Sequence, residues 1–196
     1  VSATTSIVQV VAGANHIVAL RNDGRIVAWG NNDFGQINVP ADLLVTRDAT
    51  SPLRVVMLAA GANHTLALRA NGKVLAWGDN RFGQITGTSN WANVTQIAAG
   101  ARHSVALLND NSLVSTGNNT YGQQNIPKLK GIIKITAAAN HTVALLSNGN
   151  MIAWGRNQYG QTTIPVTMRG VDVRAMADNT LILQPDGKVV VLGSNL

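Results

Sequence analysis

The hydrophobic residues of this chain occur in short runs that polar turns separate. In one period, an apolar run (VMLAAG, 56–61) leads to a second (HTLALR, 64–69) and then to a third (KVLAWG, 73–78). Asn-Gly or Asp-Gly pairs stand between most second and third runs, where a tight hairpin needs residues that tolerate positive φ. The pattern predicts consecutive antiparallel strands, and no window shows the 3.6-residue spacing of an amphipathic helix.

One phrase returns five times along the chain. It reads GANHTLALRANGKVLAWGDN at 61–80, and the other copies begin at Gly13, Gly100, Ala138 and Met176. Aligned on His, the units follow at intervals of 48, 39 and 38 residues, and Asn179 takes the His position after a further 38. The longer first interval predicts a surface loop at 41–54, since loops accept insertions at low cost.

We therefore expect a single repeat domain over residues 1–196, with units at approximately 7–40, 55–90, 94–127, 132–165 and 171–196. A unit of about 38 residues with three or four strands and no helix has the size of a propeller blade. Several strands are apolar at adjacent positions, which predicts burial on both faces, as when sheets stack. The expected fold is an all-β β-propeller with five repeat units.

These residues give the chain a resemblance to the regulator of chromosome condensation repeat family. The motifs are G-x-x-H-x-x-A-L, an Asn-Gly turn, A-W-G-x-N and F-G-Q, all present in the second unit at 61–84. The compact units are similar to the short-repeat bacterial branch, which includes a secreted propeller-type β-lactamase inhibitor. Because the familiar propellers of the family have seven blades, the resemblance implies a five-bladed ring or an incomplete seven-bladed ring.

Composition is that of a globular protein, since 12% charged and 45% hydrophobic residues argue against disorder. No apolar run approaches the roughly 18 residues that span a bilayer, and no signal segment opens the chain. Cysteine is absent, which excludes disulfides and thiolate metal sites. The first residue is Val1 rather than Met, so we expect a processing or cloning boundary before it. The resemblance implies an extracellular or cell-surface location in a bacterium.

Scarce residue types recur in the same position of several units, which is typical of structural parts rather than of one active site. Every His occupies one position, where we interpret it as a structural imidazole bonded to neighbouring backbone: His16, His64, His103 and His141. Three Trp residues end the third strand, where we expect packing between blades: Trp29, Trp77 and Trp154. Ser115-Thr116 replaces Ala-Trp in the third unit and predicts poorer packing there.

The Phe/Tyr position, immediately before Gly-Gln, lies in a connection and is the candidate for recognition. Loop aromatics on a rigid scaffold suit protein binding, because they bury a large area at low entropic cost. Neighbouring charged residues vary between the units. We predict a partner-binding rim formed by Phe34, Arg81, Phe82, Tyr121, Arg156 and Tyr159. The alternative interpretation packs these rings over the neighbouring blade.

The sequence contains no catalytic motif. All nine acidic residues are Asp, mostly in turns or linkers, and GxSxG, GxxxxGK[ST] and HExxH are all missing. Equivalent His positions on successive blades spread around a ring, whereas a metal ion needs several ligands at one point. We predict no enzymatic activity, no catalytic residues, no cofactor and no metal site.

Three functions stay open at this stage. The first is non-enzymatic binding of a protein partner of unknown identity, for which the resemblance supplies inhibitor or adhesion-type binding as examples. The second is nucleic-acid or chromatin-type binding through a basic rim at Arg25, Lys73 and Lys188, suggested by the net charge of +6. The basic residues are scattered, so we do not expect nucleic acid as the partner. The third is a structural subunit of a larger surface or membrane-associated assembly.

Overall fold

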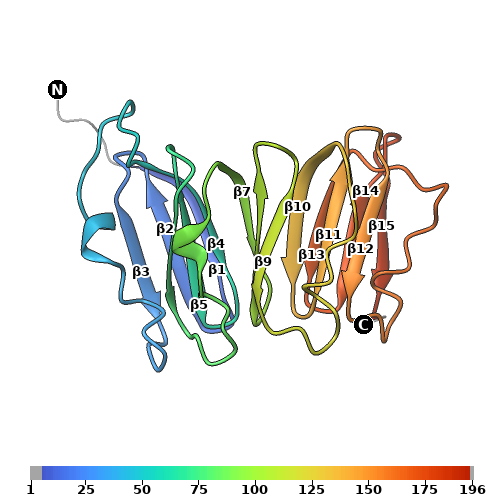
Figure 1. Ribbon diagram of the computed structural model, residues 1–196, viewed down its shortest axis with the longest axis horizontal. Helices are drawn as coiled ribbons and strands as arrows, with labels where there is room; N and C mark the ends of the chain where they lie inside the picture. Colours follow the sequence, from blue (N-terminus) through green and yellow to red (C-terminus); the bar gives the residue numbers. More distant parts are fainter. Residues whose placement is uncertain (1–5, 195–196) are drawn as a thin grey trace.

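The computed structural model describes residues 6–194, which form five three-stranded antiparallel sheets, each made of three consecutive strands (Figure 1). Blades 1 to 3 contain β1 (Ile7–Ala12), β2 (His16–Arg21), β3 (Ile26–Gly30), β4 (Val55–Ala60), β5 (His64–Arg69), β6 (Val74–Gly78), β7 (Val94–Ala99), β8 (His103–Leu108) and β9 (Leu113–Gly117). Blades 4 and 5 contain β10 (Ile132–Ala138), β11 (His141–Leu146), β12 (Met151–Gly155), β13 (Asp172–Met176), β14 (Asn179–Leu183) and β15 (Val189–Gly193). Two short 3-10 helices lie in connections, η1 (Ala41–Leu43) and η2 (Thr88–Asn90).

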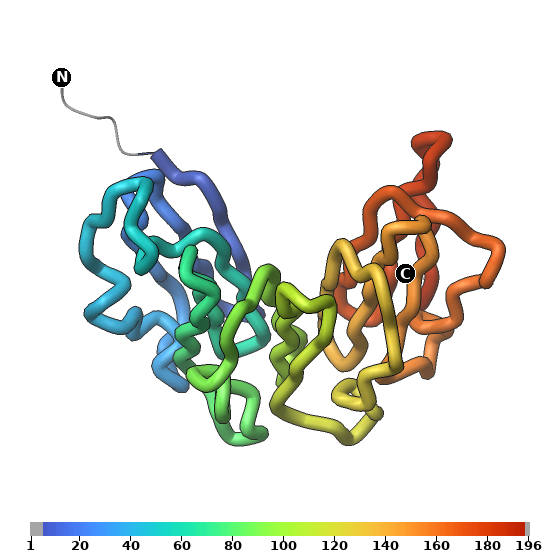
Figure 2. The backbone as a smooth tube through the Cα atoms, turned by 45° about the horizontal axis from the view of Figure 1, so that its top comes forward, coloured from blue at the N-terminus to red at the C-terminus, as the bar shows by residue number. Residues whose placement is uncertain are grey.

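The blades stand side by side in chain order and form an open arc (Figures 1 and 2). The first strand of each blade lies innermost, and together these strands line a central channel of about 800 Å³. Blades 1 and 5 are the two ends of the arc, and Figure 2 shows the gap between them. This arrangement confirms the predicted propeller architecture, although the five described blades do not close into a ring. Within residues 6–194, no helix is long and apolar enough to cross a membrane.

The apolar core lies between the blades, because each blade is a single sheet covered by its neighbours. All six residues of β5 are buried. Ala67 packs with Val18 of blade 1, whereas the adjacent Leu66 packs with Ile97 of blade 3. Successive side chains of one strand point to opposite faces, so each central strand contributes to two interfaces. This explains the adjacent apolar positions in the sequence and confirms the predicted burial of the strands on both faces.

The hairpin turns follow the predicted chemistry. Gly72 has φ of 76° between β5 and β6, in the left-handed region that glycine adopts at no steric cost. In blade 3 the corresponding turn contains Asn111 with φ of 67°. Asparagine tolerates this conformation better than other non-glycine residues, so Asp110-Asn111 forms the hairpin without a glycine.

Trp29 departs from the packing role that the sequence predicts. Trp77 and Trp154 are 6% and 7% exposed, and their Nε1–H groups donate to Gln36 O at 2.9 Å and Gln123 O at 3.0 Å, each in the preceding blade. Trp29 is 47% exposed. The prediction is wrong for this residue because no sheet within residues 6–194 covers that face of blade 1.

Blade 3 replaces the missing indole by hydrogen bonds. Thr116 Oγ1 donates to Gly83 O at 2.9 Å, and Ser104 Oγ on the adjacent strand donates to Gln84 O at 2.7 Å. Gln84 O corresponds to the carbonyls that accept from indoles in blades 2 and 4. The large apolar contact of an indole is absent in blade 3, but Gln84 O of the preceding blade still accepts a hydrogen bond, from Ser104 Oγ.

The connection at 41–54 is not wholly a surface loop. Most of it is exposed, but Leu43 in η1 is 2% exposed and packs into the core between blades 1 and 2. Asp42 beside it forms ion pairs with Arg47 of the same connection and with Arg69 at the end of β5. The inserted segment therefore closes the outer side of this interface.

Side chains of the inner strands link neighbouring blades along the channel. Gln9 Nε2 donates to Leu58 O at 3.0 Å, and Gln9 Oε1 accepts from Leu58 N at 2.8 Å. Gln96 makes the corresponding pair, at 2.7 Å to Ile133 O and 3.1 Å from Ile135 N. Each primary amide caps backbone groups on the free edge of the next inner strand, where unpaired N–H and C=O groups are costly to bury.

Met57 stands in blade 2 at the position of these glutamines, and its thioether cannot cap the edge of β7. We expect Met57→Gln to raise the free energy of unfolding by about 1 kcal/mol, because it adds hydrogen bonds to the inner strand of blade 3. Urea unfolding followed by far-UV circular dichroism measures the change. The matched variant Gln96→Met should lose a similar amount, and no gain in Met57→Gln would contradict the capping role.

Candidate functional site

One side of the arc carries the candidate binding residues. In each blade the turn between the first two strands lies beside the loop that follows the third strand. Asn31 N donates to Asn15 O at 2.8 Å and joins the two segments in blade 1, and equivalent bonds recur in blades 2 to 4. We define the aromatic rim as these turns and loops: 13–15, 31–38, 61–63, 79–86, 100–102, 118–125, 139–140, 156–163 and 177–178.

A fully buried glutamine fixes each aromatic loop. Gln36, Gln84, Gln123 and Gln161 are 0% exposed, and each Oε1 accepts from the backbone N–H of the Phe or Tyr two residues earlier, at 2.8 to 2.9 Å. An Asn stands four residues before each glutamine. Its Oδ1 accepts from the backbone N–H of the residue that follows the glutamine, at 2.8 to 3.2 Å. The loop backbone is therefore held in place. Sequence reasoning assigned these glutamines no role, although their repetition after Gly was a usable signal.

Each imidazole joins its blade to the next. His64 Nε2 lies 3.0 Å from Ser104 Oγ, and His103 Nε2 lies 2.9 Å from Thr142 Oγ1. Because Ser104 Oγ donates its only proton to Gln84 O, it must accept from His64, which places the imidazole proton on Nε2. The sequence interpretation expected neighbouring backbone as the partner. The structure adds a hydroxyl of the following blade as a partner of each imidazole, and backbone of Ala62 and Asn179 also interacts with His16 and His141.

Burial keeps these imidazoles neutral. It lowers the pKa of His64 to about 4 and the pKa of His103 to about 3. The pKa of His141 is lowered to about 4, and the pKa of His16 is lowered as well, again mainly by burial. Gly61 leaves room for the ring, since a Cβ there would lie 2.1 Å from His64 Cε1. A buried, neutral imidazole that is bonded across an interface acts as scaffold.

Arginines stack on the rim aromatics, mostly across blade boundaries. The distances from guanidinium carbon to ring centroid are 3.9 Å for Arg81 over Phe34, 4.4 Å for Arg102 over Phe82, 5.4 Å for Arg156 over Tyr121 and 5.5 Å for Arg156 over Tyr159. The rings stay accessible: Phe82, Tyr121 and Tyr159 are 37%, 48% and 46% exposed. The structure thus brings all six predicted residues, four rings and two arginines, onto one rim. Phe34, Phe82 and Tyr121 contact an arginine of the next blade, whereas Tyr159 contacts Arg156 of its own blade.

Arg102 is the rim residue that sequence reasoning missed. It precedes His103, at the position where Asn15, Asn63 and Asn140 stand in other blades. The change from amide to cation in one unit was the available signal. Its contact with Phe82, however, joins two segments that are far apart within the repeat and follows only from the fold.

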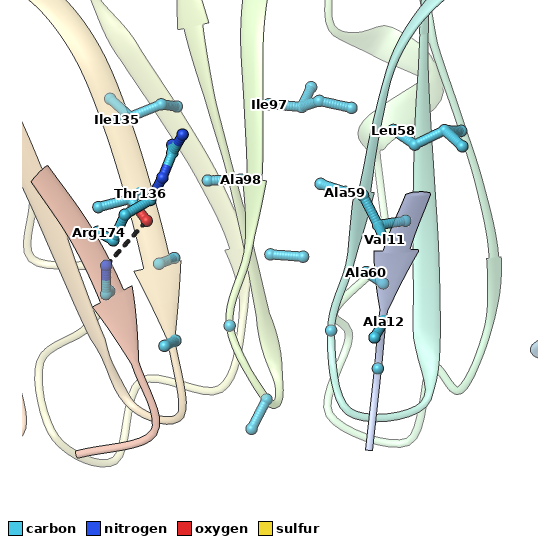
Figure 3. Close-up of a pocket in the computed structure, with 18 of the residues that line it drawn as sticks. Val11, Ala12, Leu58, Ala59, Ala60, Ile97, Ala98, Ile135, Thr136 and Arg174 are labelled. Carbon is cyan, nitrogen blue, oxygen red and sulfur yellow. Dashed lines mark hydrogen bonds between the residues drawn. The ribbon is translucent and has the colours of Figure 1, made fainter. Parts of the chain in front are cut away.

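The central channel is a separate, concave feature of the arc. Small residues of the inner strands line much of it, and Figure 3 shows Ala59 and Ala60 across from Thr136 and Arg174. Lys134 pairs with Asp172, and Thr136 Oγ1 accepts from Ala175 N at 3.1 Å. Among residues 6–194, no three His or Asp side chains lie together in a group that could hold a metal ion.

The stacked blades, the buried imidazole at each interface and the repeated aromatic loop define a repeat protein of the β-propeller class. The model of the regulator of chromosome condensation (RCC1) repeat matches residues 7–36, 55–84, 94–123 and 132–161. The chain belongs to this family, whose propellers are typically protein-interaction modules and generally non-catalytic. Comparison with the sequences of curated proteins gives no match.

Solved structures share the fold at low sequence identity. Prp20p from Saccharomyces cerevisiae is 23% identical with a TM-score of 0.79, and the match covers 96% of this chain and 58% of that one. Human WBSCR16 is 19% identical with a TM-score of 0.76, covering 96% and 62%. The ectodomain of the Arabidopsis thaliana receptor kinase ACR4 is 18% identical with a TM-score of 0.72, covering 98% and 65%. This chain spans less than two thirds of each, and the likeness concerns the fold alone.

We expect the free energy of unfolding to fall as the pH decreases from about 7.5 to 5, because the folded-state pKa values of the imidazoles lie below 6.5 and the unfolded chain takes up protons first. The loss is about 2 kcal/mol for each of His64 and His103. Urea unfolding at both pH values measures it. His103→Asn, which places there the residue found at Asn179, should show a change smaller by about 2 kcal/mol. An unaltered pH dependence would contradict a neutral, buried His103.

Proposed function

We propose that this chain is a non-enzymatic protein-interaction module that binds a protein partner through the aromatic rim. The observation that carries this proposal is a row of rings that are between about a third and a half exposed while their backbone is fixed. The buried glutamines hold the loops, and stacked arginines restrict the rings. Such residues lose little conformational entropy on binding, which is characteristic of interface hot spots.

The relatives support protein binding as the class of function. Prp20p has binding properties toward Gsp1p and histones, and a second structure has yeast RCC1 bound to Kap60. Those partners belong to proteins at most 23% identical, so they suggest a protein ligand and no particular identity. We propose an extracellular or cell-surface location, and a larger assembly as the setting, on the family resemblance of the repeat motifs.

We expect the double variant Phe82→Ala/Tyr121→Ala to retain at most about a tenth of the partner protein that the wild type retains, because truncation of hot-spot aromatics lowers the binding energy. Immobilised wild type and variant are compared by quantitative mass spectrometry of proteins retained from the source cells. The matched control Leu53→Ala/Val166→Ala removes exposed apolar side chains away from the rim and should retain the partners. Equal capture by both double variants, with native circular dichroism, would refute the rim as the binding surface.

A second candidate function rests on the distribution of charge. The hairpin side is defined as the turns between second and third strands, the last residue of each second strand and the connections into the next blade. It carries ten basic residues: Arg21, Arg25, Arg47, Arg54, Arg69, Lys73, Lys128, Lys130, Arg169 and Lys188. It carries five acidic ones: Asp23, Asp42, Asp48, Asp110 and Asp186. The net charge of +6 is therefore concentrated on one side, which favours polyanion binding there.

If this side binds nucleic acid, the Kd for duplex DNA should rise by at least about tenfold between 50 and 200 mM salt. Fluorescence anisotropy measures it. Arg25→Ala/Lys73→Ala should weaken binding and reduce the salt dependence, whereas Arg81→Ala on the other side should leave both unchanged. Absence of salt-sensitive binding would remove this candidate.

A further inference from the structure

Arg102 lies on the aromatic rim, at a repeat position where the other four units have Asn or Asp. It lies in the turn between β7 and β8, and its exposed side chain stacks over Phe82 of blade 2 at 4.4 Å from the ring centroid. Its carbonyl accepts from Asn118 N at 2.8 Å, at the start of the loop that carries Tyr121. Arg102 is thus joined to both neighbouring aromatic loops, one through its side chain and the other through its backbone.

The other two rim arginines are neutralised. Arg81 binds Asp79 in a bidentate pair, with Nε 3.0 Å from Oδ1 and Nη2 2.9 Å from Oδ2. Arg156 Nη1 lies 3.5 Å from Asp178 Oδ1. Within residues 6–194, no carboxylate pairs with Arg102. Its cationic charge is the one on this rim that the described part of the protein leaves without a counter-ion.

Stacking prepares this group for a ligand. A guanidinium that lies over a ring uses its face for the cation–π contact, while the N–H donors at its edge stay free to bind an anion. The preferred anion for two parallel donors is a planar carboxylate or a phosphate. Phe82, 37% exposed, offers apolar surface beside it, and Tyr121, 48% exposed, lies in the loop that is bonded to the Arg102 carbonyl.

The charge of the rim favours a carboxylate over a polyanion. The rim holds three arginines and three aspartates, so it has no net charge: Arg81, Arg102, Arg156, Asp33, Asp79 and Asp178. A nucleic acid would be attracted to the hairpin side, because its binding depends on a surplus of positive charge that the rim does not have. A single acidic side chain needs only one unpaired cation, and it gains one charge-assisted pair with Arg102.

We propose that Arg102 binds the carboxylate of an Asp or Glu in the protein partner, and that Phe82 and Tyr121 contact an apolar side chain next to it. This inference deepens the proposed function and rests on the rim being the binding surface. Arg102 would then determine specificity, because a partner with an uncharged residue at that point leaves the guanidinium covered and unpaired.

The test uses a displayed library of random peptides, selected on the wild-type protein. We expect the recovered peptides to share an acidic residue beside an aromatic or aliphatic one. By calorimetry, Arg102→Asn, which restores the residue of the other blades, should raise the Kd of a synthetic representative by about 10- to 100-fold. Arg102→Lys should keep only part of the affinity, since an ammonium lacks the planar fork. Arg25→Asn on the hairpin side is the matched control and should leave the Kd unchanged.

The outcomes separate this inference from the proposed function. Peptides that lose binding in Phe82→Ala/Tyr121→Ala but lack a common acidic residue, or bind Arg102→Asn equally well, overturn the role of Arg102 and leave the rim as the binding surface. Both proposals are overturned if the peptides bind the Phe82→Ala/Tyr121→Ala variant and the Arg102 variants as tightly as the wild type, or if the selection yields no binder. A third result is that duplex DNA or inorganic phosphate displaces a selected peptide from the wild type but not from Arg102→Asn. That result would overturn the carboxylate and identify a phosphate as the ligand of Arg102.

Discussion

The contact on which the arc depends is the buried bond between a neutral imidazole and a hydroxyl of the next blade. A buried polar group that loses its partner costs about 1–3 kcal/mol, so this pair constrains its surroundings closely. Gly61 must lack a side chain so that His64 fits, and Ser104 must present its hydroxyl from the following blade. Ser104 in turn donates to Gln84 O. One interface bond therefore constrains the residue type at three separate positions of the repeat: Gly61, His64 and Ser104.

The same glutamine connects the scaffold to the rim. The backbone carbonyl of Gln84 accepts from Ser104 of blade 3, while its side-chain Oε1 accepts from Phe82 N. One buried residue thus takes part both in the contact between blades 2 and 3 and in fixing the backbone that carries the exposed ring. Arg81, three residues before it, differs from its counterparts Asp33, Thr120 and Gln158, and it pairs locally with Asp79. A repeated skeleton with unrepeated loop residues is what allows a binding surface to change without loss of the fold.

Much of this architecture could be predicted from the sequence, since hairpin turns, doubly buried strands and a fixed period are local signals. The placement of His16, Trp77 and Phe82 by repeat position was of this kind. Trp29 was misjudged because repeat position carries no information about whether a neighbouring sheet is there. Leu43 was assigned to a surface loop because an insertion has no sibling for comparison. The stacking of Arg102 on Phe82 depends on the rotation between blades, which no pattern within one unit encodes.

The packing of each blade on its sequence neighbours has a consequence for how the molecule unfolds. Stability in such an array is a sum of blade terms and nearest-neighbour terms, so cooperativity is transmitted only as far as successive interfaces hold. Within residues 6–194, blades 1 and 5 each have one interface and the inner blades have two. The loss of one interface therefore affects the two blades that share it first, and it reaches more distant blades only through the interfaces between them.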